Sequence, residues 1–443
     1  MKKILFASTA LVAAGLLTTG SAEASEKIKL SLGGFSKWWV VGTWQDQGYQ
    51  DAKTVNNALG GGQGSLATGS TIGANYTNVD IKGDNEVWFG GSTTLDNGIK
   101  VGVDIHLEAG GHTDATTDTI DKSYVFVEGG FGKFIVGKQK NGTYLLHVTA
   151  PDAAGNWNEG GIMTANYAIA KPTGVNLMAG GNTTAIRTTD NATSFTYVAP
   201  TFYGLTVGAS FLPYGYEATR GVVDLNSIAN VVATTGAAVN AAVRQVYGAG
   251  ALYANTFGAV GVKVSAGAVY GDAAPGTAVS WFEQAYGTQI SYAGFTLGGS
   301  YRHQQANYKG GQGTTVTDLA LAATTGATYQ TDGGNGSLSN GGAFDVGLQY
   351  ATGPYAISFA YFRSAVAHQI LSTVTTGGNG NDIAEFYQLS GKYALGAGVD
   401  ILASAGYASY SSAVTKSSTT GISSGDTLHN SGWTVMSGIS LAF

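Results

Sequence analysis

The charged residues that could do chemistry in this chain are isolated side chains set into alternating apolar segments. Lys263 stands between two valines, and Asp104 stands between a valine and an isoleucine. Asp345 and Asp400 are each flanked by apolar residues in the same way. Successive side chains of a strand point to opposite faces, so each of these charges falls opposite an apolar stripe. Charges along one wetted face create a field that sorts ions rather than a catalytic centre.

Motifs for catalysis, for cofactors or for metals are missing from the sequence. The six histidines are scattered and there is no cysteine, so neither an H-E-x-x-H helix nor a structural zinc site is indicated. The glycine run 60–62 lacks the Gly-Lys-Ser/Thr that completes a phosphate-binding loop. We therefore expect no enzyme, no cofactor and no metal. One alternative stays open: Asp114, Asp118 and Asp121 could offer oxygen ligands to calcium, although a solvated acidic loop is the simpler interpretation.

The elements that must position these charges are short strands with a period of two residues. Turn residues such as Asp96-Asn97-Gly98, Ala293-Gly294, Thr352-Gly353-Pro354 and Ala394-Leu395-Gly396 separate pairs of strands. We predict sixteen strands, centred near residues 34, 84, 104, 125, 136, 196, 208, 249, 264, 287, 299, 347, 359, 388, 402 and 437. Seven short turns then alternate with eight longer connections.

The longer connections are rich in Gly, Ser, Thr, Asn and Ala and include residues 42–76, 141–190, 214–243, 305–342, 365–382 and 411–430. Short turns at one end and long loops at the other are typical of transmembrane barrels, where the turns are periplasmic and the loops extracellular. Aromatic residues gather beside the short turns, as in a girdle at a membrane interface. They are Tyr197, Phe202, Tyr203, Tyr253, Phe257, Tyr292, Phe295, Tyr350, Tyr355 and Tyr393.

The first 24 residues predict export. A basic start, an apolar run from Ile4 to Leu17 and the sequence Ala22-Glu23-Ala24 indicate a secretory signal peptide at 1–24, which leaves 25–443 as a single domain. Removing it changes the net charge from −6 to −7, which gives no reason to expect a nucleic-acid partner. Without cysteine, no disulfide holds the exported fold.

The composition of the remaining chain favours a membrane barrel. Charged residues make up 11% of the sequence, against about 25% in ordinary soluble domains. Glycine accounts for 68 of the 443 residues. No apolar run of roughly 18 residues follows the signal, so a transmembrane helix is not expected. Inside lipid only a closed β-barrel then satisfies every backbone polar group, and we predict an all-β, antiparallel transmembrane barrel.

Several segments resemble Gram-negative general porins, especially those of alphaproteobacteria. They are Ser31–Phe35, Leu95–Val103, Tyr124–Lys133, Val136–Gln139, Thr149–Ala153 and the terminal Phe443. The resemblance covers nearly the whole mature chain. It implies a homotrimer in the outer membrane of a Gram-negative bacterium, in contact with lipid and lipopolysaccharide. It also implies that Phe443 is the signal read by the barrel-assembly machinery.

The same resemblance implies a constriction formed by the third long loop, which starts near Asn141 and folds into the lumen. That loop offers Asp152, Trp157 and Glu159. The facing wall is expected to carry basic residues, namely Lys138, Lys82, Lys37, Lys263 and Arg302, and acidic residues, namely Asp104, Glu108, Asp345 and Asp400. Position 138 is often arginine in such porins, and lysine there keeps the charge but loses the planar fork.

The expected function is therefore a water-filled channel for passive diffusion of ions and small hydrophilic solutes, with a mild preference for cations. One alternative is a porin selective for a sugar or a peptide, with Trp39 or Trp88 lining the lumen. Two others are a secreted glycine-rich β adhesin and a barrel enzyme such as an outer-membrane lipase.

Overall fold

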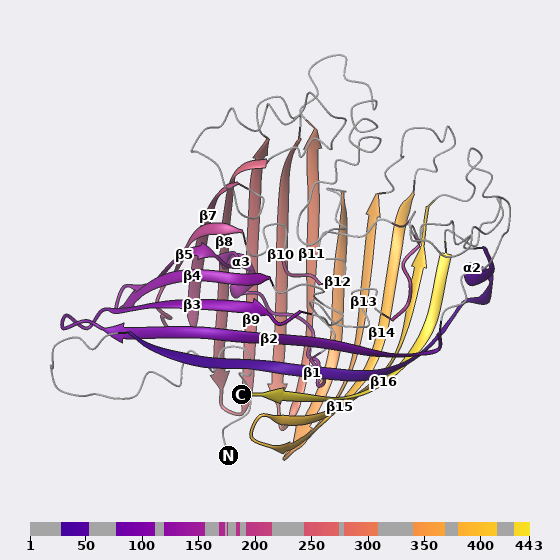
Figure 1. Ribbon diagram of the computed structural model, residues 1–443. Helices are drawn as coiled ribbons and strands as arrows, with labels where there is room; N and C mark the ends of the chain where they lie inside the picture. The colour runs from indigo at the N-terminus through magenta and orange to yellow at the C-terminus, as the bar shows by residue number, and fades with distance from the viewer. Residues whose placement is uncertain are drawn as a thin grey trace, which may run out of the picture.

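The computed structural model describes most of the chain from Ile28 to Phe443. The described residues are 28–52, 77–110, 119–155, 168–172, 175, 183–186, 192–214, 243–273, 279–308, 340–367, 380–413 and 429–443. Their sixteen strands form one closed antiparallel barrel in which each strand pairs with its neighbours in sequence, and β1 pairs with β16 (Figure 1). The predicted signal peptide lies outside the described residues and stays a prediction.

All sixteen predicted strands are present. They are β1 (Lys29–Gln45), β2 (Val79–Thr94), β3 (Lys100–Glu108), β4 (Ile120–Gly129), β5 (Gly132–Lys138), β6 (Thr193–Val198), β7 (Leu205–Tyr214), β8 (Val243–Phe257), β9 (Val260–Ala273), β10 (Val279–Tyr292), β11 (Phe295–Tyr308), β12 (Gly341–Thr352), β13 (Tyr355–Ala367), β14 (Asn381–Gly396), β15 (Val399–Ser411) and β16 (His429–Ala442). The two short helices are α2 (Gln47–Ala52) and α3 (Gly142–Leu145). No helix among the described residues is long and apolar enough to cross a bilayer.

One predicted turn is displaced. The chain does not turn at Ala394–Gly396, because β14 continues to Gly396 and a register shift follows Ala394. The turn falls instead at residues 397–398, where Gly398 has a φ of 71°. A left-handed backbone of this kind favours glycine, and the sequence has a glycine both in the predicted turn, Gly396, and in the observed turn, Gly398.

The outer face of the barrel is apolar, as the alternation predicted. In β16, Trp433 and Val435 are 61% and 53% exposed, while Thr434 and Met436 between and after them are buried. In β9, Val264 is 46% exposed on this outer face, and Lys263 lies on the opposite one. Inward and outward positions therefore follow the sequence residue by residue, because strand side chains alternate.

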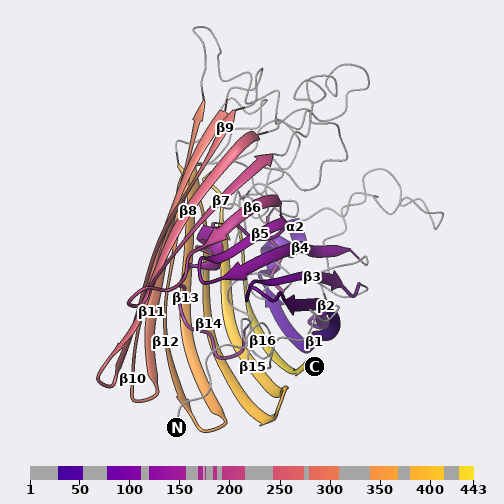
Figure 2. The same ribbon diagram turned by 90° about the vertical axis from the view of Figure 1, so that its left-hand side faces the viewer.

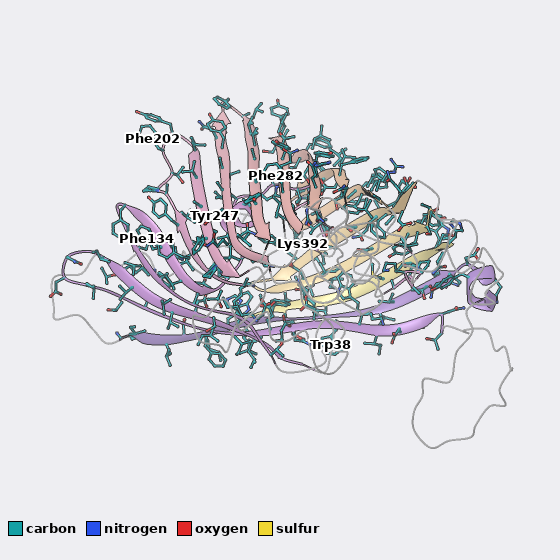
Figure 3. The ribbon with its side chains drawn as sticks, turned by 90° about the horizontal axis from the view of Figure 1, so that it is seen from above. Trp38, Phe134, Phe202, Tyr247, Phe282 and Lys392 are labelled. Atoms are coloured by element: carbon teal, nitrogen blue, oxygen red, sulfur yellow. The ribbon has the colours of Figure 1, made fainter. Side chains whose placement is uncertain are left out.

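Two rows of aromatic rings lie on this outer face. In the predicted row beside the short turns, Tyr197 and Tyr253 are half-buried and the other rings are exposed. Tyr203 and Phe202 are the most exposed, at 83% and 71%, and Figure 3 labels Phe202. A second row crosses five strands through directly paired residues, namely Tyr361, Tyr387, Tyr407, Trp433 and Trp44. Two aromatic rows that bound an apolar band are the arrangement found at the two interfaces of a bilayer.

The C-terminus closes the barrel. Gly34 and Phe443 exchange two backbone hydrogen bonds of 3.0 and 3.1 Å, and Phe35 pairs with Ala442. No strand edge is left unpaired there, as lipid requires. Around the ring the strand axes differ in tilt: β1 to β4 lie across the view of Figure 1, while β9 to β13 stand nearly vertical with alternating directions, and Figure 2 shows the same contrast from the side.

Candidate functional site

The interior of the barrel is occupied by the segment that follows β5. It begins with α3, where the side chain of Asn141 accepts a hydrogen bond from the Tyr144 amide at 3.0 Å and caps the first turn. The side-chain nitrogen of Asn141, Nδ2, also donates to the carbonyl oxygen of Ile186 at 3.0 Å. This bond joins the start of the segment to residues 183–186, the leg that returns toward β6. This is the third long connection of the chain, and the prediction that it folds into the lumen is confirmed.

Hydroxyl groups on the inner wall hold this segment. Three of its backbone amides donate to serine oxygens, from Gly142 to Ser210 at 2.7 Å, from Val148 to Ser265 at 3.0 Å and from Ala153 to Ser358 at 2.8 Å. These serines belong to β7, β9 and β13. The segment therefore crosses the wall from β7 to β13, and each buried amide finds a partner, as a backbone away from water requires.

Glycines on the strands between these, β8, β10 and β12, let the segment approach the wall. A Cβ atom on Gly287 would overlap the carbonyl oxygen of Val148, and one on Gly250 would lie 2.9 Å from the Cα of Thr143. On β12, a Cβ on Gly347 would lie 3.2 Å from the Cβ of Ala150. Side chains at these inward positions would push the segment into the lumen, so part of the high glycine content serves this contact.

The segment then reaches the opposite strands. Ala154, Ala168, Ile169 and Val175 belong to one buried apolar cluster with inward side chains of β1 and of β12 to β16, among them Val41, Phe362, Phe386, Tyr410 and Met436. Both backbone polar groups of Ala170 are hydrogen-bonded to side chains of the wall. Its amide donates to Gln45 Oε1 at 2.8 Å, and its carbonyl oxygen accepts from Asn430 Nδ2 at 2.6 Å. The inner faces of β12 to β16, and of β1 near Val41, are therefore packed rather than wet.

A buried ion pair holds the returning leg. Arg302 on β11 and Glu283 on β10 are both fully buried, with Nη2 and Oε2 separated by 2.6 Å. A second guanidinium nitrogen, Nη1, donates to the carbonyl oxygen of Ala185 at 3.0 Å. Arg302 was predicted to line the pore wall, and that prediction is wrong: its inward direction is correct, but residues 183–186 lie between it and the water.

Asp345 is also buried by the inner segment. Its Oδ1 accepts hydrogen bonds from the amide of Ala150 at 3.1 Å and from the hydroxyl of Ser300 at 2.5 Å, and the residue is 3% exposed. The predicted acidic wall group is therefore a partner of the inner segment and not a lumen charge. Alternation predicts the face of a strand, but not what covers that face.

His147 joins both legs of the segment from within. Its Nε2 lies 3.1 Å from the hydroxyl of Thr184 on the returning leg. Burial, together with the positive charge of Arg302, lowers the pKa of His147 to about 4. The imidazole is thus neutral at neutral pH, and it can accept the hydrogen bond of Thr184.

The inner faces of β1 and β2 are different, because charged side chains there keep part of their surface exposed. Lys37 and Asp84 lie 3.9 Å apart, each 28% exposed at the side chain. Lys82 pairs with Asp80 at 2.6 Å, with side chains 19% and 56% exposed. Lys37 and Lys82 thus face inward and are partly exposed, and their role as residues of the pore wall stays a prediction.

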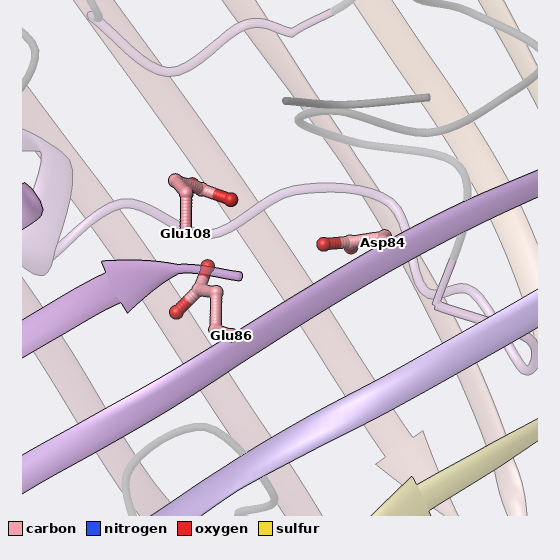
Figure 4. A group of neighbouring side chains, drawn as sticks. All are labelled: Asp84, Glu86 and Glu108. Carbon is pink, nitrogen blue, oxygen red and sulfur yellow. The ribbon is translucent and has the colours of Figure 1, made fainter. Parts of the chain in front are cut away.

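Carboxylates gather on the same wall. One oxygen from each of Asp84, Glu86 and Glu108 lies within 4.8 Å of the others, and Figure 4 shows the three side chains on neighbouring strands. Glu108 was predicted, whereas Asp84 and Glu86 were missed. The signal was present in the sequence, since Lys82, Asp84 and Glu86 alternate on β2 and share its inward face. Such oxygen groups attract cations.

Two aromatic rings continue this charged wall. Trp88 on β2 stacks on His106 of β3 with ring centroids 4.8 Å apart, and its indole nitrogen donates to Glu86 at 2.5 Å. The ring nitrogens of His106 lie 3.4 Å from Glu86 and 3.4 Å from Asp104. Asp104, predicted as a wall acid, also accepts a hydrogen bond from Tyr124 at 2.8 Å.

Other predicted wall residues are spread around the barrel. Lys263 faces inward from β9 and is partly exposed. Asp400 lies 3.7 Å from Lys392 on β14, close to the β14–β15 turn (Figure 3). These groups lie on the lumen side, but the structure does not gather them with the β2 and β3 charges.

The prediction for Lys138 is wrong. Lys138 shares the face of Val136, which is 47% exposed on the outside, while the inward residues of β5 are Ile135 and Gly137. Its ammonium donates to the carbonyl oxygen of Ile120 at the end of β4. The prediction came from resemblance alone and ran against the alternation of the strand.

The predicted constriction residues are only partly described. Asp152 lies in the inner segment and accepts a hydrogen bond from the amide of Ala154 at 3.1 Å. Trp157 and Glu159 lie outside the described residues, as do Asp114 and Asp118. Asp121 is described and lies 3.2 Å from Lys122. The constriction therefore stays a prediction for Trp157 and Glu159.

Comparison with known proteins agrees with this architecture. A family model described as Gram-negative porin matches residues 7–413. An anion-selective porin from Comamonas acidovorans is similar in structure, with a TM-score of 0.54, 14% identity, and coverage of 94% of this chain and 100% of that one. The outer membrane channel DcaP of Acinetobacter baumannii gives a TM-score of 0.53 and 12% identity over 95% and 100%. The trimer form of OmpT, an outer membrane protein of Vibrio cholerae, gives 0.51 and 10% over 94% and 99%. No curated protein sequence matches the chain. At these identities the structural likeness concerns the fold alone.

Proposed function

Because the chain belongs to the family of Gram-negative porins, which reside in the outer membrane, we propose that it is a passive channel for ions and small hydrophilic solutes with a mild cation preference. The observation that carries the proposal is the contrast inside the barrel. The inner segment covers the wall from β7 to β13, while Lys37, Asp84 and Lys82 on β1 and β2 keep part of their surface exposed. Solutes would then cross beside the charged wall.

The cation preference is supported by the charges of that wall. Four carboxylates, on Asp84, Glu86, Asp104 and Glu108, face the lumen from β2 and β3. One unit charge at about 10 Å in water contributes only about 0.4 kcal/mol, and salt screens it over about 8 Å. Lys37, Lys82 and Lys122 offset part of the acidic charge, so the preference is expected to be mild. The anion selectivity named for the Comamonas porin belongs to that protein.

The experiment is conductance in planar bilayers, with purified full-length protein and a tenfold KCl gradient. We expect stepwise, ohmic openings and a reversal potential that indicates a potassium-to-chloride permeability ratio of about two to five, in line with a fraction of a kcal/mol to about 1 kcal/mol of selectivity. Absence of conductance would refute the channel. A reversal potential of the opposite sign would refute only the cation preference.

Assembly is a further part of the proposal. A homotrimer is supported by the trimer form recorded for the Vibrio cholerae neighbour. Phe443, 59% exposed on the outer face and bonded to Gly34, would be read by the barrel-assembly machinery, and the apolar outer face would contact lipid and lipopolysaccharide. Deleting Phe443 should lower the amount of heat-modifiable trimer in outer membranes, without changing the conductance of the channels that do form. Normal trimer levels in the deletion strain would contradict this role.

The competing interpretations differ in support. A secreted adhesin does not fit a closed barrel with two exposed aromatic rows. An enzyme would need a catalytic group, and we propose a channel without one. A solute-selective channel is favoured by one observation, the aromatic stack of Trp88 and His106 on the exposed wall.

A further inference from the structure

We propose that Phe35, Trp88 and His106 form a subsite in the lumen that binds small organic cations carrying an apolar ring. The inference rests on the proposed channel function and adds the class of solute that the exposed wall retains. The three side chains come from β1, β2 and β3, which are adjacent in the barrel.

The rings form a continuous aromatic surface. Phe35 meets Trp88 edge to face with centroids 5.8 Å apart, and Trp88 stacks on His106 at 4.8 Å with an interplanar angle of 25°. Trp88 is hydrogen-bonded to Glu86 through its indole nitrogen, which holds the ring in place. A fixed ring face of this kind offers both apolar contact and the negative side of an aromatic quadrupole.

The charge around the rings selects the ligand. Glu86 and Asp104 flank His106 at 3.4 Å each, and Asp84 and Glu108 approach Glu86. Lys37 and Lys122 offset part of this acidic charge, but the carboxylates stand directly beside the rings, so an ammonium group would find acceptors at the ring face that an anion would not. Carboxylates next to aromatic rings are the combination that recognises organic ammonium ions.

The protein already places a cation on this surface. The ammonium of Lys37 lies 4.5 Å from the centroid of Phe35, while the same nitrogen is 3.9 Å from Asp84. Because Lys37 occupies the position over Phe35, the solute ammonium would take the corresponding position beside Trp88 and Glu86. The internal lysine thus shows the geometry that we infer for the ligand.

Phe35 and Trp88 are more exposed to solvent than the aromatic rings packed under the inner segment. Phe362, Phe386 and Tyr410 also point inward but are at most 1% exposed, because they pack in the cluster formed with the inner segment. Phe35 and Trp88 are only partly buried. Among the described inward rings, a solute in the lumen can therefore reach this stack but not that cluster.

The test is block of the ion current by benzylammonium in planar bilayers with the full-length protein. Benzyl alcohol lacks the charge, benzoate reverses it and methylammonium lacks the ring, so these three compounds separate the contributions. We expect brief, concentration-dependent interruptions with benzylammonium, and at least about tenfold weaker block by each of the other three, the size expected when one cation–π or charge contact is lost.

Variants locate the site. Trp88→Leu keeps the apolar bulk but removes the ring face and should weaken the block about five- to tenfold, while Trp88→Phe should stay within about threefold of the original protein. Trp38→Ala is the matched control, since Trp38 lies on β1 but is 40% exposed on the outer face. Glu86→Gln should also weaken the block, because it removes one of the charges.

The outcomes separate this inference from the channel function. Normal conductance with no block by benzylammonium overturns the subsite and leaves the channel intact. Equal block by benzyl alcohol, or unchanged block in Trp88→Leu, overturns it as well. Loss of block in Trp88→Leu together with retention in Trp88→Phe and Trp38→Ala supports it. Absence of conductance in the original protein refutes the channel itself and the subsite with it.

Discussion

The inner wall from β7 to β13 and the inner wall of β1 to β4 are both built from strands with alternating side chains, yet inward charges are buried on the first and partly exposed on the second. On the first, glycines and serines such as Gly287 and Ser265 receive the backbone of the inner segment, and the charged pair Arg302 and Glu283 is fully buried. On the second, charges such as Lys37 and Asp84 keep 28% of their side-chain surface. An inward charge is thus a buried structural group on one wall and a partly exposed group on the other.

The largest expected effect comes from removing a charge on the covered wall. Arg302→Met leaves Glu283 buried without its partner, and losing one partner of a buried pair costs about 3–5 kcal/mol. Lys37→Met, on the exposed wall, should change stability by less than about 1 kcal/mol. Heat or urea unfolding in detergent, followed by the shift in electrophoretic mobility, gives both values. Similar losses for the two variants would remove the distinction between the walls.

The two faces of a single strand offer the next comparison. Val264→Arg puts a charge on the lipid face of β9 and should destabilise the barrel by about 2–4 kcal/mol if the site is near the bilayer midplane. Lys263→Ser, one residue away on the lumen face, should be tolerated and change only conduction. Unfolding in liposomes measures the first effect, and single-channel conductance the second. An equally large stability loss in Lys263→Ser would count against the register.

Acid should loosen the inner segment. The docked His147 has a pKa of about 4, while a released one would have the usual value near 6.5. Between about pH 4 and pH 6.5, His147 binds fewer protons when the inner segment is docked than when it is released. The free energy of docking is therefore most favourable above about pH 6.5. It weakens as the pH falls, and the contribution of neutral His147 is fully lost below about pH 4. At 1.36 kcal/mol per pKa unit, the loss of docking free energy is at most about 3.4 kcal/mol. Channel noise and conductance should rise between pH 7 and pH 4.5. His147→Gln should remove most of that rise, and an unchanged pH profile in this variant would assign it to other groups.

The smallest expected effect is on ion preference. Asp84→Asn combined with Glu86→Gln removes two charges from the exposed wall and should shift the permeability ratio toward anions by about two- to fourfold, since each charge contributes a fraction of a kcal/mol. Expression and unfolding should hardly change. Asp345→Asn, on the covered wall, is the matched carboxylate: it should leave the ratio nearly unchanged and reduce stability. A larger selectivity shift from Asp345→Asn would reverse the comparison.

The predicted constriction extends this comparison to the inner segment itself. Asp152 and Glu159 were expected to act together on cations, with Asp152 in the described part and Glu159 outside it. Asp152→Asn with Glu159→Gln should move the reversal potential at low salt toward anions, by an amount no larger than the wall variant. No shift at low salt would place both carboxylates away from the solute path.

Alternation within the sequence determined the number of strands, their order and the face of nearly every inward and outward residue. Val264 and Lys263 are on the predicted faces, and so are Trp433 and Val435. These features follow from a period of two residues and from turn chemistry, which are local properties of the chain. Lys138 was misplaced only where resemblance was followed instead of that local pattern.

The tertiary structure alone decided which inward residues meet water. Asp345 has the same apolar neighbours in sequence as Asp104, yet Asp345 is buried against Ala150, while Asp104 stands beside His106. Arg302 also faces inward and is buried against Ala185. Covering depends on contacts between segments more than a hundred residues apart, such as Val148 with Ser265. A period of two residues carries no information about such contacts, because it records the face of each side chain but not the chain that packs against it.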